Sequence, residues 1–308
     1  MKEIDNRKCV ILYLVRNSKR DIKDLKKSLH LLDINFNDKY HYPVFIFHEN
    51  FTYTIMNDIQ NHTLSNIFFQ QITFNVPDFL NKNEVPEYVY IDDSPYSIGF
   101  NIGYRHMCRF FAGMIYNQSI LKDFDYYWRL DAHSYILKSI EYDIFKYMED
   151  NNFEYGYIDS GRDITNTQTL WKVTMQYLKD NNIKYDKVWN EFAYGTNFEI
   201  SNFKFWRSEI YQKYFDYLDM SGGIYKYRWG DHIIHYLAIM LFMSEDRLHK
   251  FTDIIYQHNK DIYNYKPKVS WISNLFNPIL SVIYLQLLRV SSLLKRRSKM
   301  YRNFRDGT

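Results

Sequence analysis

The amino-acid sequence predicts an α/β fold with a mainly parallel sheet that helices cover on both faces. Short apolar runs alternate with helical segments along most of the chain, as in βαβ units. The first two runs, Cys9 to Arg16 and Val44 to Phe47, are apolar at nearly all positions, which is typical of strands buried on both faces. The 308 residues contain no internal repeat or low-complexity linker. We therefore expect one domain over residues 1–265 and a C-terminal segment over residues 266–308.

The expected elements follow each other in a regular order. After the first strand, Asn17-Ser18 can cap a helix whose apolar residues recur at a helical period. Residues 56–103 show little periodicity and contain three prolines, so we interpret them as a long, partly helical excursion. Further strands are expected at 126–130, 155–158, 194–200 and 251–256, and helices at 104–116, 203–218 and 229–243.

Charged side chains lie at the ends of two expected strands. Arg16 ends the first strand, and Asp131 ends the strand at 126–130. Ligands of open α/β sheets bind at the carboxyl ends of the strands. A ligand site is therefore expected at this edge of the sheet.

The composition excludes several classes of protein. The chain is 46% hydrophobic and 24% charged, as ordinary globular proteins are, and unlike disordered or collagenous ones. A net charge of +3, without a basic stripe outside the C-terminus, argues against nucleic-acid binding. The 19% aromatic content accompanies many Asn, Ile and Lys residues, and we attribute it to codon bias. The two cysteines, Cys9 and Cys108, rule out a disulfide scaffold and leave their pairing open.

The C-terminal segment has two alternative interpretations. Residues 269–288 are uncharged and largely apolar, although Pro278 interrupts them, and a basic cluster follows at residues 295–299. An apolar helix with a polybasic tail is typical of a membrane-surface anchor. The alternative is a helix packed on the domain with a solvated basic end. No signal peptide precedes the first strand, so the expected location is either membrane-associated or cytoplasmic.

The block from Tyr194 to His258 holds the most informative residues. Glu199 lies in an apolar, aromatic run, where a carboxylate needs a compensating partner or a shifted pKa. Asp231 follows Arg228-Trp229-Gly230 at the start of an expected helix. His258 ends another short apolar run. Each of these residues requires either a functional role or a structural partner.

This block, with the strand that ends at Asp131, resembles the retaining α-1,2-mannosyltransferases of glycosyltransferase family 15, the yeast-type Golgi enzymes. The resemblance covers about residues 8–262 and is weaker at 56–103 and 160–190. It implies a GT-A-like nucleotide-diphospho-sugar transferase fold. It also implies transfer of mannose from a GDP-mannose donor to a hydroxyl of a glycan or glycoprotein acceptor, with retention. The motifs that carry it are 14–17, 41–47, 104–110, 126–131 and 196–258.

The resemblance further implies a divalent-metal site. The family uses an acidic residue and a histidine to bind manganese (Mn2+), at the positions of Asp131 and His258. A cation held by oxygen and imidazole ligands neutralises the diphosphate as the sugar leaves. Taken alone, Asp131 would be interpreted as a turn residue and His258 as a surface histidine.

Catalytic roles are implied for Glu199 and Tyr104. A retaining transfer needs a group on the sugar face opposite the leaving diphosphate, either as a covalent nucleophile or as a fixed negative charge. The family has a glutamate at the position of Glu199 and a tyrosine close to the sugar at that of Tyr104. The alternatives are a core glutamate paired with an arginine and an ordinary aromatic residue at a helix start.

Three further residues are candidates for donor binding. Asp231 either holds sugar hydroxyls or is a helix-start carboxylate favoured by the helix dipole. Arg16 and Arg129 are candidate partners of the diphosphate and base, because guanidinium groups suit phosphate. Surface ion pairs are the alternative for both arginines.

Two positions depart from the pattern of the family. Asp131-Ala132-His133 stands where the family has an acid, a proline and often a second acid, so His133 is a candidate ligand of the metal or the phosphate. Gly195 stands where the family has a tryptophan, so acceptor specificity is not carried over. Two other functions stay open, a transferase that uses another nucleotide sugar and a non-catalytic carbohydrate- or nucleotide-binding relative. The sequence does not indicate an oligomeric state.

Overall fold

The computed structural model describes residues 8–90, 99–163 and 167–264. The chain divides into a first unit, residues 1–264, and a second, residues 265–308. The expected apolar C-terminal helix and basic tail fall in the second unit, none of whose residues is described. Within the described ranges, no helix is both long and apolar enough to cross a bilayer.

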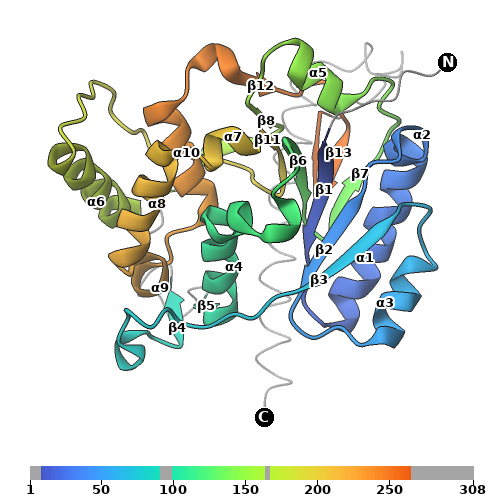
Figure 1. The fold of residues 1–308 in the computed structure, drawn as a ribbon, viewed down its shortest axis with the longest axis horizontal. Helices are drawn as coiled ribbons and strands as arrows, with labels where there is room; N and C mark the ends of the chain where they lie inside the picture. Colours follow the sequence, from blue (N-terminus) through green and yellow to red (C-terminus); the bar gives the residue numbers. More distant parts are fainter. Residues whose placement is uncertain (1–7, 91–98, 164–166, 265–308) are drawn as a thin grey trace, which may run out of the picture. The chain divides into compact units, whose positions relative to one another are not determined.

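A seven-stranded sheet forms the centre of the first unit (Figure 1). Its strand order is β12-β8-β11-β6-β1-β2-β3. β11 is antiparallel to both of its neighbours, and the other neighbouring pairs are parallel. The predicted α/β class with a mainly parallel sheet is therefore confirmed. The strands are β1 (Cys9–Leu14), β2 (Val44–His48), β3 (Ile67–Gln71), β6 (Tyr126–Leu130), β8 (Tyr155–Tyr157), β11 (Phe198–Asn202) and β12 (Leu248–Lys250).

Helices cover both faces of this sheet, as predicted (Figure 1). Successive side chains of a strand point to opposite faces. Val10 and Leu12 of β1 pack in a core that includes α4, α8 and α10, whereas Ile11 and Tyr13 pack in a second core with α1. The helices are α1 (Lys19–Leu32), α2 (Asp38–Tyr40), α3 (Tyr53–Gln60), α4 (Ile102–Ala112), α5 (Ile144–Asp150), α6 (Thr167–Asp180), α7 (Phe203–Trp206), α8 (Glu209–Met220), α9 (Gly223–Tyr227) and α10 (Asp231–Phe242).

The prediction for residues 56–103 missed one strand of the central sheet. β3 pairs in parallel with β2 and forms the edge of the sheet. Ile67 on one face of β3 is buried, whereas Phe68 on the other face stacks on Phe45 of β2 and is 40% exposed. This part of the chain also contains a short antiparallel pair, β4 (Tyr88–Tyr90) with β5 (Gly99–Asn101).

Two expected strands have different bounds in the structure. The run 194–200 is divided between β10 (Phe192–Tyr194) and β11, because the chain turns at Gly195, whose carbonyl accepts a hydrogen bond from Phe198 N (3.4 Å). β10 then pairs with β9 (Ser160–Arg162) and not with the central sheet. The prediction of a strand at 251–256 is wrong, since a loop connects β12 to β13, which begins only at Tyr256.

Two helices that were expected to be continuous are interrupted in the structure. α4 stops at Ala112 because the backbone of Gly113 is not helical (φ −156°, ψ −43°), and a short 3-10 helix follows at Met114–Asn117. The helix expected at 203–218 is divided into α7 and α8, since the Ser208 side chain accepts a hydrogen bond from Tyr211 N and so caps α8.

A second, three-stranded sheet lies next to the end of β6. It contains β7 (Ser134–Ile136), β13 (Tyr256–His258) and β14 (Asp261–Tyr263) in the order β14-β13-β7. β7 and β13 are antiparallel, and Ser134 is directly opposite His258. This register pairs residues that are 120 to 124 positions apart in the sequence.

Candidate active site

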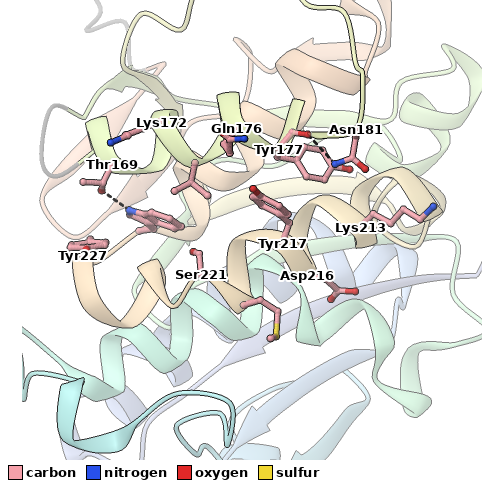
Figure 2. A pocket seen from close by; sticks show the side chains of 13 residues that line it. Thr169, Lys172, Gln176, Tyr177, Asn181, Lys213, Asp216, Tyr217, Ser221 and Tyr227 are labelled. Atoms are coloured by element: carbon pink, nitrogen blue, oxygen red, sulfur yellow. Dashed lines mark hydrogen bonds between the residues drawn. The ribbon is translucent and has the colours of Figure 1, made fainter. Parts of the chain in front are cut away.

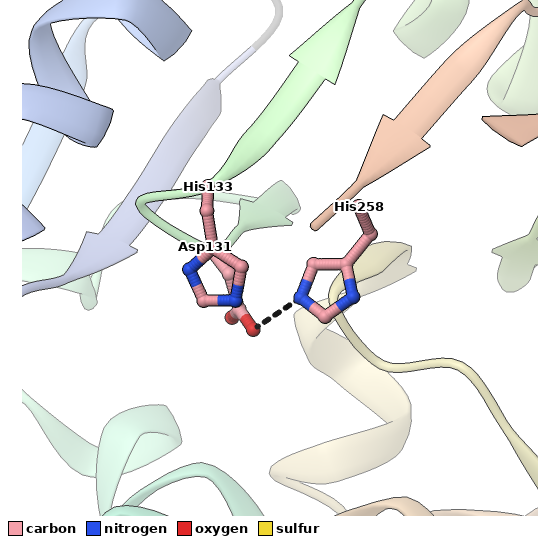
Figure 3. Close-up of side chains that lie close together, drawn as sticks. All are labelled: Asp131, His133 and His258. Carbon is pink, nitrogen blue, oxygen red and sulfur yellow. Dashed lines mark ion pairs between the residues drawn. The ribbon is translucent and has the colours of Figure 1, made fainter. Parts of the chain in front are cut away.

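Asp131, His133 and His258 form a cluster of metal-ligand groups (Figure 3). Asp131 directly follows β6, His133 directly precedes β7, and His258 ends β13. One ligand atom from each residue lies within 4.8 Å of the other two. The sequence predicted Asp131 and His258 as metal ligands and His133 as a ligand of metal or phosphate, and the structure brings all three side chains together.

The geometry of this cluster leaves it accessible. His258 Nε2 lies 3.5 Å from Asp131 Oδ2, and the imidazole rings of His133 and His258 stack with their centroids 4.5 Å apart. The side chains of Asp131 and His258 are 28% and 19% exposed. A ligand that approaches from solvent can therefore reach these groups.

The ionisation of the cluster suits a cation. Burial tends to raise the pKa of Asp131, but hydrogen bonding to His258 and the charge of Arg129 outweigh it and lower the pKa below the usual range. Burial lowers the pKa of His133, although Asp131 opposes this change. An ionised carboxylate next to a neutral imidazole is the state in which both groups bind metals.

A buried ion pair connects the cluster to α10. Arg129 donates from Nη1 to Asp231 Oδ2 (2.6 Å), and its Nη2 lies 3.7 Å from Asp131 Oδ1. Thr196 also donates to Asp231 (3.0 Å), and the guanidinium lies over the ring of Phe111. The two charged partners are only 2% and 3% exposed. Arg129 therefore links a candidate metal ligand to a candidate sugar-binding carboxylate, and it is not part of a surface ion pair.

Glu199 is buried in a closed hydrogen-bond network. Its carboxylate accepts from the hydroxyls of Tyr127 (2.6 Å) and Tyr155 (2.9 Å) and pairs with His235 Nδ1 (2.7 Å). Burial raises the pKa of Glu199, but His235 and the other partners outweigh it, so the carboxyl keeps a lowered pKa. The sequence predicted that this carboxylate needs a partner, and the partner is a histidine, not an arginine. With 1% exposure, both oxygens are engaged by the protein.

The sequence reasoning missed the three residues that hold Glu199. Tyr127 and Tyr155 lie on strands that were predicted. Which residue their hydroxyl groups bond to depends on how these strands align with β11. The sequence could have placed His235 close to Asp231. The two residues are four positions apart in α10 and therefore lie on the same face of the helix.

Tyr104 lies in a second polar group, next to α10. Arg228 Nη2 donates to the Tyr104 hydroxyl (3.4 Å), and Arg228 Nη1 lies 3.7 Å from Asp163 Oδ2. The same Asp163 oxygen lies 2.8 Å from His232 Nε2. Burial raises the pKa of Tyr104 well above its usual range, so the phenol stays protonated. Arg228 was noted in the sequence only as part of a motif, and its contact with Tyr104 was not predicted.

Arg16 forms a surface ion pair. Its side chain is 80% exposed, and Nε donates to Asp21 Oδ2 at 2.7 Å. This arrangement matches the alternative interpretation of Arg16, and a role in diphosphate binding stays a prediction.

A cleft of about 920 Å³ lies apart from the metal-ligand cluster, between α6 and α8 (Figure 2). Tyr217 and Tyr227 line it together with polar side chains such as Lys172 and Lys213. Neither the metal-ligand cluster nor Glu199 lines this cleft. Size alone therefore does not identify the active site, and the converging ligand atoms at the end of β6 are the better guide.

The fold and the site define a glycosyltransferase architecture of the GT-A type. The structure is similar to that of core-mannan synthase A from Aspergillus fumigatus, solved in a Mn/GDP form (TM-score 0.77, 27% identity, 88% of this chain and 80% of that chain). It is also similar to the mannosyltransferase Ktr4p from S. cerevisiae in complex with GDP (TM-score 0.74, 28% identity, 83% and 72%).

The chain belongs to the glycolipid 2-alpha-mannosyltransferase family, whose model matches residues 1–274. It is 36% identical over 278 residues to glycolipid 2-alpha-mannosyltransferase 2 of Candida albicans. It is 32% identical over 283 residues to glycolipid 2-alpha-mannosyltransferase of Saccharomyces cerevisiae. These matches cover 82% and 83% of this chain but only 58% and 64% of the relatives, so the chain spans about three fifths of their length.

Proposed function

We propose that this protein is a metal-dependent, retaining glycosyltransferase that transfers mannose from GDP-mannose to a hydroxyl of a glycan or glycoprotein acceptor. The observation that carries the proposal is the accessible cluster of Asp131, His133 and His258 at the end of β6. Two similar structures, one solved in complex with GDP and one in a Mn/GDP form, support the proposal.

The donor groups of this cluster fit a divalent cation such as Mn2+. Asp131 supplies a carboxylate oxygen and His258 an imidazole nitrogen, and both groups are partly exposed. A cation held there would act as a Lewis acid for the diphosphate. The protein itself fixes both ligands, because Asp131 directly follows β6 and His258 ends β13.

The charged residues behind the cluster suit the handling of the donor sugar. In our proposal Asp231 holds sugar hydroxyls, Tyr104 lies close to the sugar, and Arg129 keeps Asp231 ionised and in place. Glu199 supplies a fixed negative charge. Both of its oxygens are occupied and it is almost fully buried, so the geometry supports electrostatic stabilisation over covalent attack.

We expect the protein to bind GDP in preference to UDP and CMP, and only with a divalent metal. Thermal shift of the full chain with each nucleotide and Mn2+, before and after EDTA, measures this preference. Asp131→Ala should abolish the metal-dependent shift, because the cation loses its charged ligand. Asp58→Ala removes an exposed carboxylate paired with Lys26 and is the matched control. A GDP shift insensitive to EDTA and to Asp131→Ala would contradict the proposal.

Two alternatives have clear outcomes in the same experiments. A preference for UDP or CMP would indicate a transferase that uses another nucleotide sugar. GDP binding without transfer or donor hydrolysis would indicate a non-catalytic relative. Membrane contact through residues 269–308 stays a separate prediction, which vesicle flotation with and without this segment tests.

A further inference from the structure

We propose that His133 is a third protein ligand of the metal and that the resulting site favours transition-metal ions over Mg2+ and Ca2+. The inference rests on the proposed metal site and adds to it a ligand and a metal preference. Asp131, His133 and His258 together supply one carboxylate and two imidazoles. This set differs from a carboxylate-rich magnesium site in both charge and donor type.

The backbone around the cluster holds all three residues in place. Ser134 N donates to the Asp131 carbonyl (3.0 Å), and Asp131 N donates to Ser134 Oγ (3.1 Å), which closes a tight turn over residues 131–134. Asn259 N donates to the His133 carbonyl (3.4 Å), so the residue after His258 is tied to the same turn. His133 is therefore positioned by the same contacts that position the other two ligands.

The distances between the ligand atoms of the cluster are close to those found around a bound metal ion. Two ligand atoms of one ion, each at about 2.0–2.2 Å from it, lie at most about 4.4 Å apart. Asp131 and His258 already meet this limit at 3.5 Å, and no pair in the cluster is wider than 4.8 Å. A small side-chain rotation therefore brings His133 into the first coordination sphere.

The charge and type of the ligands set the metal preference. One carboxylate and two neutral imidazoles leave a divalent ion with a net charge of +1, which favours a diphosphate. Imidazole nitrogen suits Fe, Ni, Cu and Zn ions, whereas Mg2+ and Ca2+ are hard ions that select oxygen. Affinity should therefore rise from Mn2+ to Co2+, along the usual order of divalent metals, and Mg2+ should bind most weakly.

Calorimetric titration of the full chain with Mn2+, Co2+ and Mg2+, without nucleotide, tests the proposal. We expect His133→Ala to lose about tenfold or more in Mn2+ and Co2+ affinity, since even indirect perturbation of metal ligands costs 10- to 100-fold. His133→Asp should keep a ligand but shift the preference toward Mg2+. The visible absorption of bound Co2+ should change in both variants, which is a readout independent of activity.

His62→Ala removes an exposed histidine paired with Asp58 and is the matched control. Thermal melting shows whether each variant is folded. If His133→Ala does not fold, His133→Asp still tests the proposal. Wild-type Mn2+ affinity and an unchanged Co2+ spectrum in both His133 variants would overturn the third-ligand proposal. If Asp131→Ala and His258→Ala lose metal in the same titration, the proposed function survives that result.

Discussion

Glu199→Gln should lower kcat by ~10²-fold or more while KM for GDP-mannose stays close to its wild-type value. A negative charge that stabilises the developing positive anomeric carbon acts mainly in the transition state, so its removal affects turnover more than binding. Steady-state mannose transfer, measured beside GDP affinity, separates the two effects. Turnover near the wild-type rate with intact GDP binding would contradict the role of Glu199, and Asp231 would then be the next candidate.

The structure explains why glutamine is the appropriate substitution. Glu199 accepts from two tyrosine hydroxyls and pairs with His235 Nδ1. A glutamine can still accept from Tyr127 and can donate its amide to His235 when that ring nitrogen carries no proton. Alanine would remove the carboxylate to which Tyr127, Tyr155 and His235 Nδ1 are bonded, at about 1–3 kcal/mol for each buried group left unsatisfied. Glu84→Gln changes an exposed carboxylate and is the control for unspecific effects.

Arg129→Met should destabilise the fold by about 3–5 kcal/mol, the usual cost of removing one partner of a buried ion pair. Asp231 would remain almost fully buried without its counter-charge, and the contact of the guanidinium with Phe111 would be lost. Urea denaturation gives the free energy of unfolding. Arg16→Met is the matched control, because it removes an exposed ion pair with Asp21 that is worth about 0–1 kcal/mol. Equal losses in both variants would contradict the structural importance of the buried pair.

The same pair predicts how stability depends on pH. Burial raises the pKa of Asp231, but Arg129 and the neighbouring histidines outweigh it and hold the pKa below that of an unfolded aspartate, about 3.9. A lowered pKa in the folded state stabilises the protein above the unfolded value, and this contribution is lost as the pH falls below it. In Arg129→Met the largest of these opposing charges is lost and only the histidines remain, so the pKa of Asp231 should rise. The stability that the lowered pKa gives the wild type as the pH rises through about 3.9 should therefore be reduced in the variant. Unfolding curves between pH 3 and 8 should therefore differ in slope between the two proteins.

The central strands were predictable because they are apolar at successive positions. β1, β2 and β6 are buried on both faces, which leaves an unambiguous pattern. β3 escaped prediction because it is an edge strand with one half-exposed face, so its sequence resembles that of a loop. The break between β10 and β11 depends on the turn at Gly195, which apolar periodicity does not reveal.

The site was predictable only in part, because strand register and tertiary packing determine most of its contacts. Residues at strand ends, such as Asp131 and His258, can be placed from the sequence together with the resemblance. The contact of His133 with His258 depends on the register of β7 and β13. The partners of Glu199 come from β6, β8 and α10, and only tertiary packing determines which hydroxyls and ring nitrogens meet the carboxylate.

The most direct test of the proposed activity is mannose transfer from GDP-mannose to an α-mannoside acceptor by the full chain, with Mn2+ and after EDTA. NMR of the product determines the anomer that forms. The proposed function predicts an α-linked product that forms with Mn2+, stops with EDTA and is absent with Asp131→Ala. A folded protein that binds GDP but forms no product, or forms it equally well with EDTA, would contradict the account.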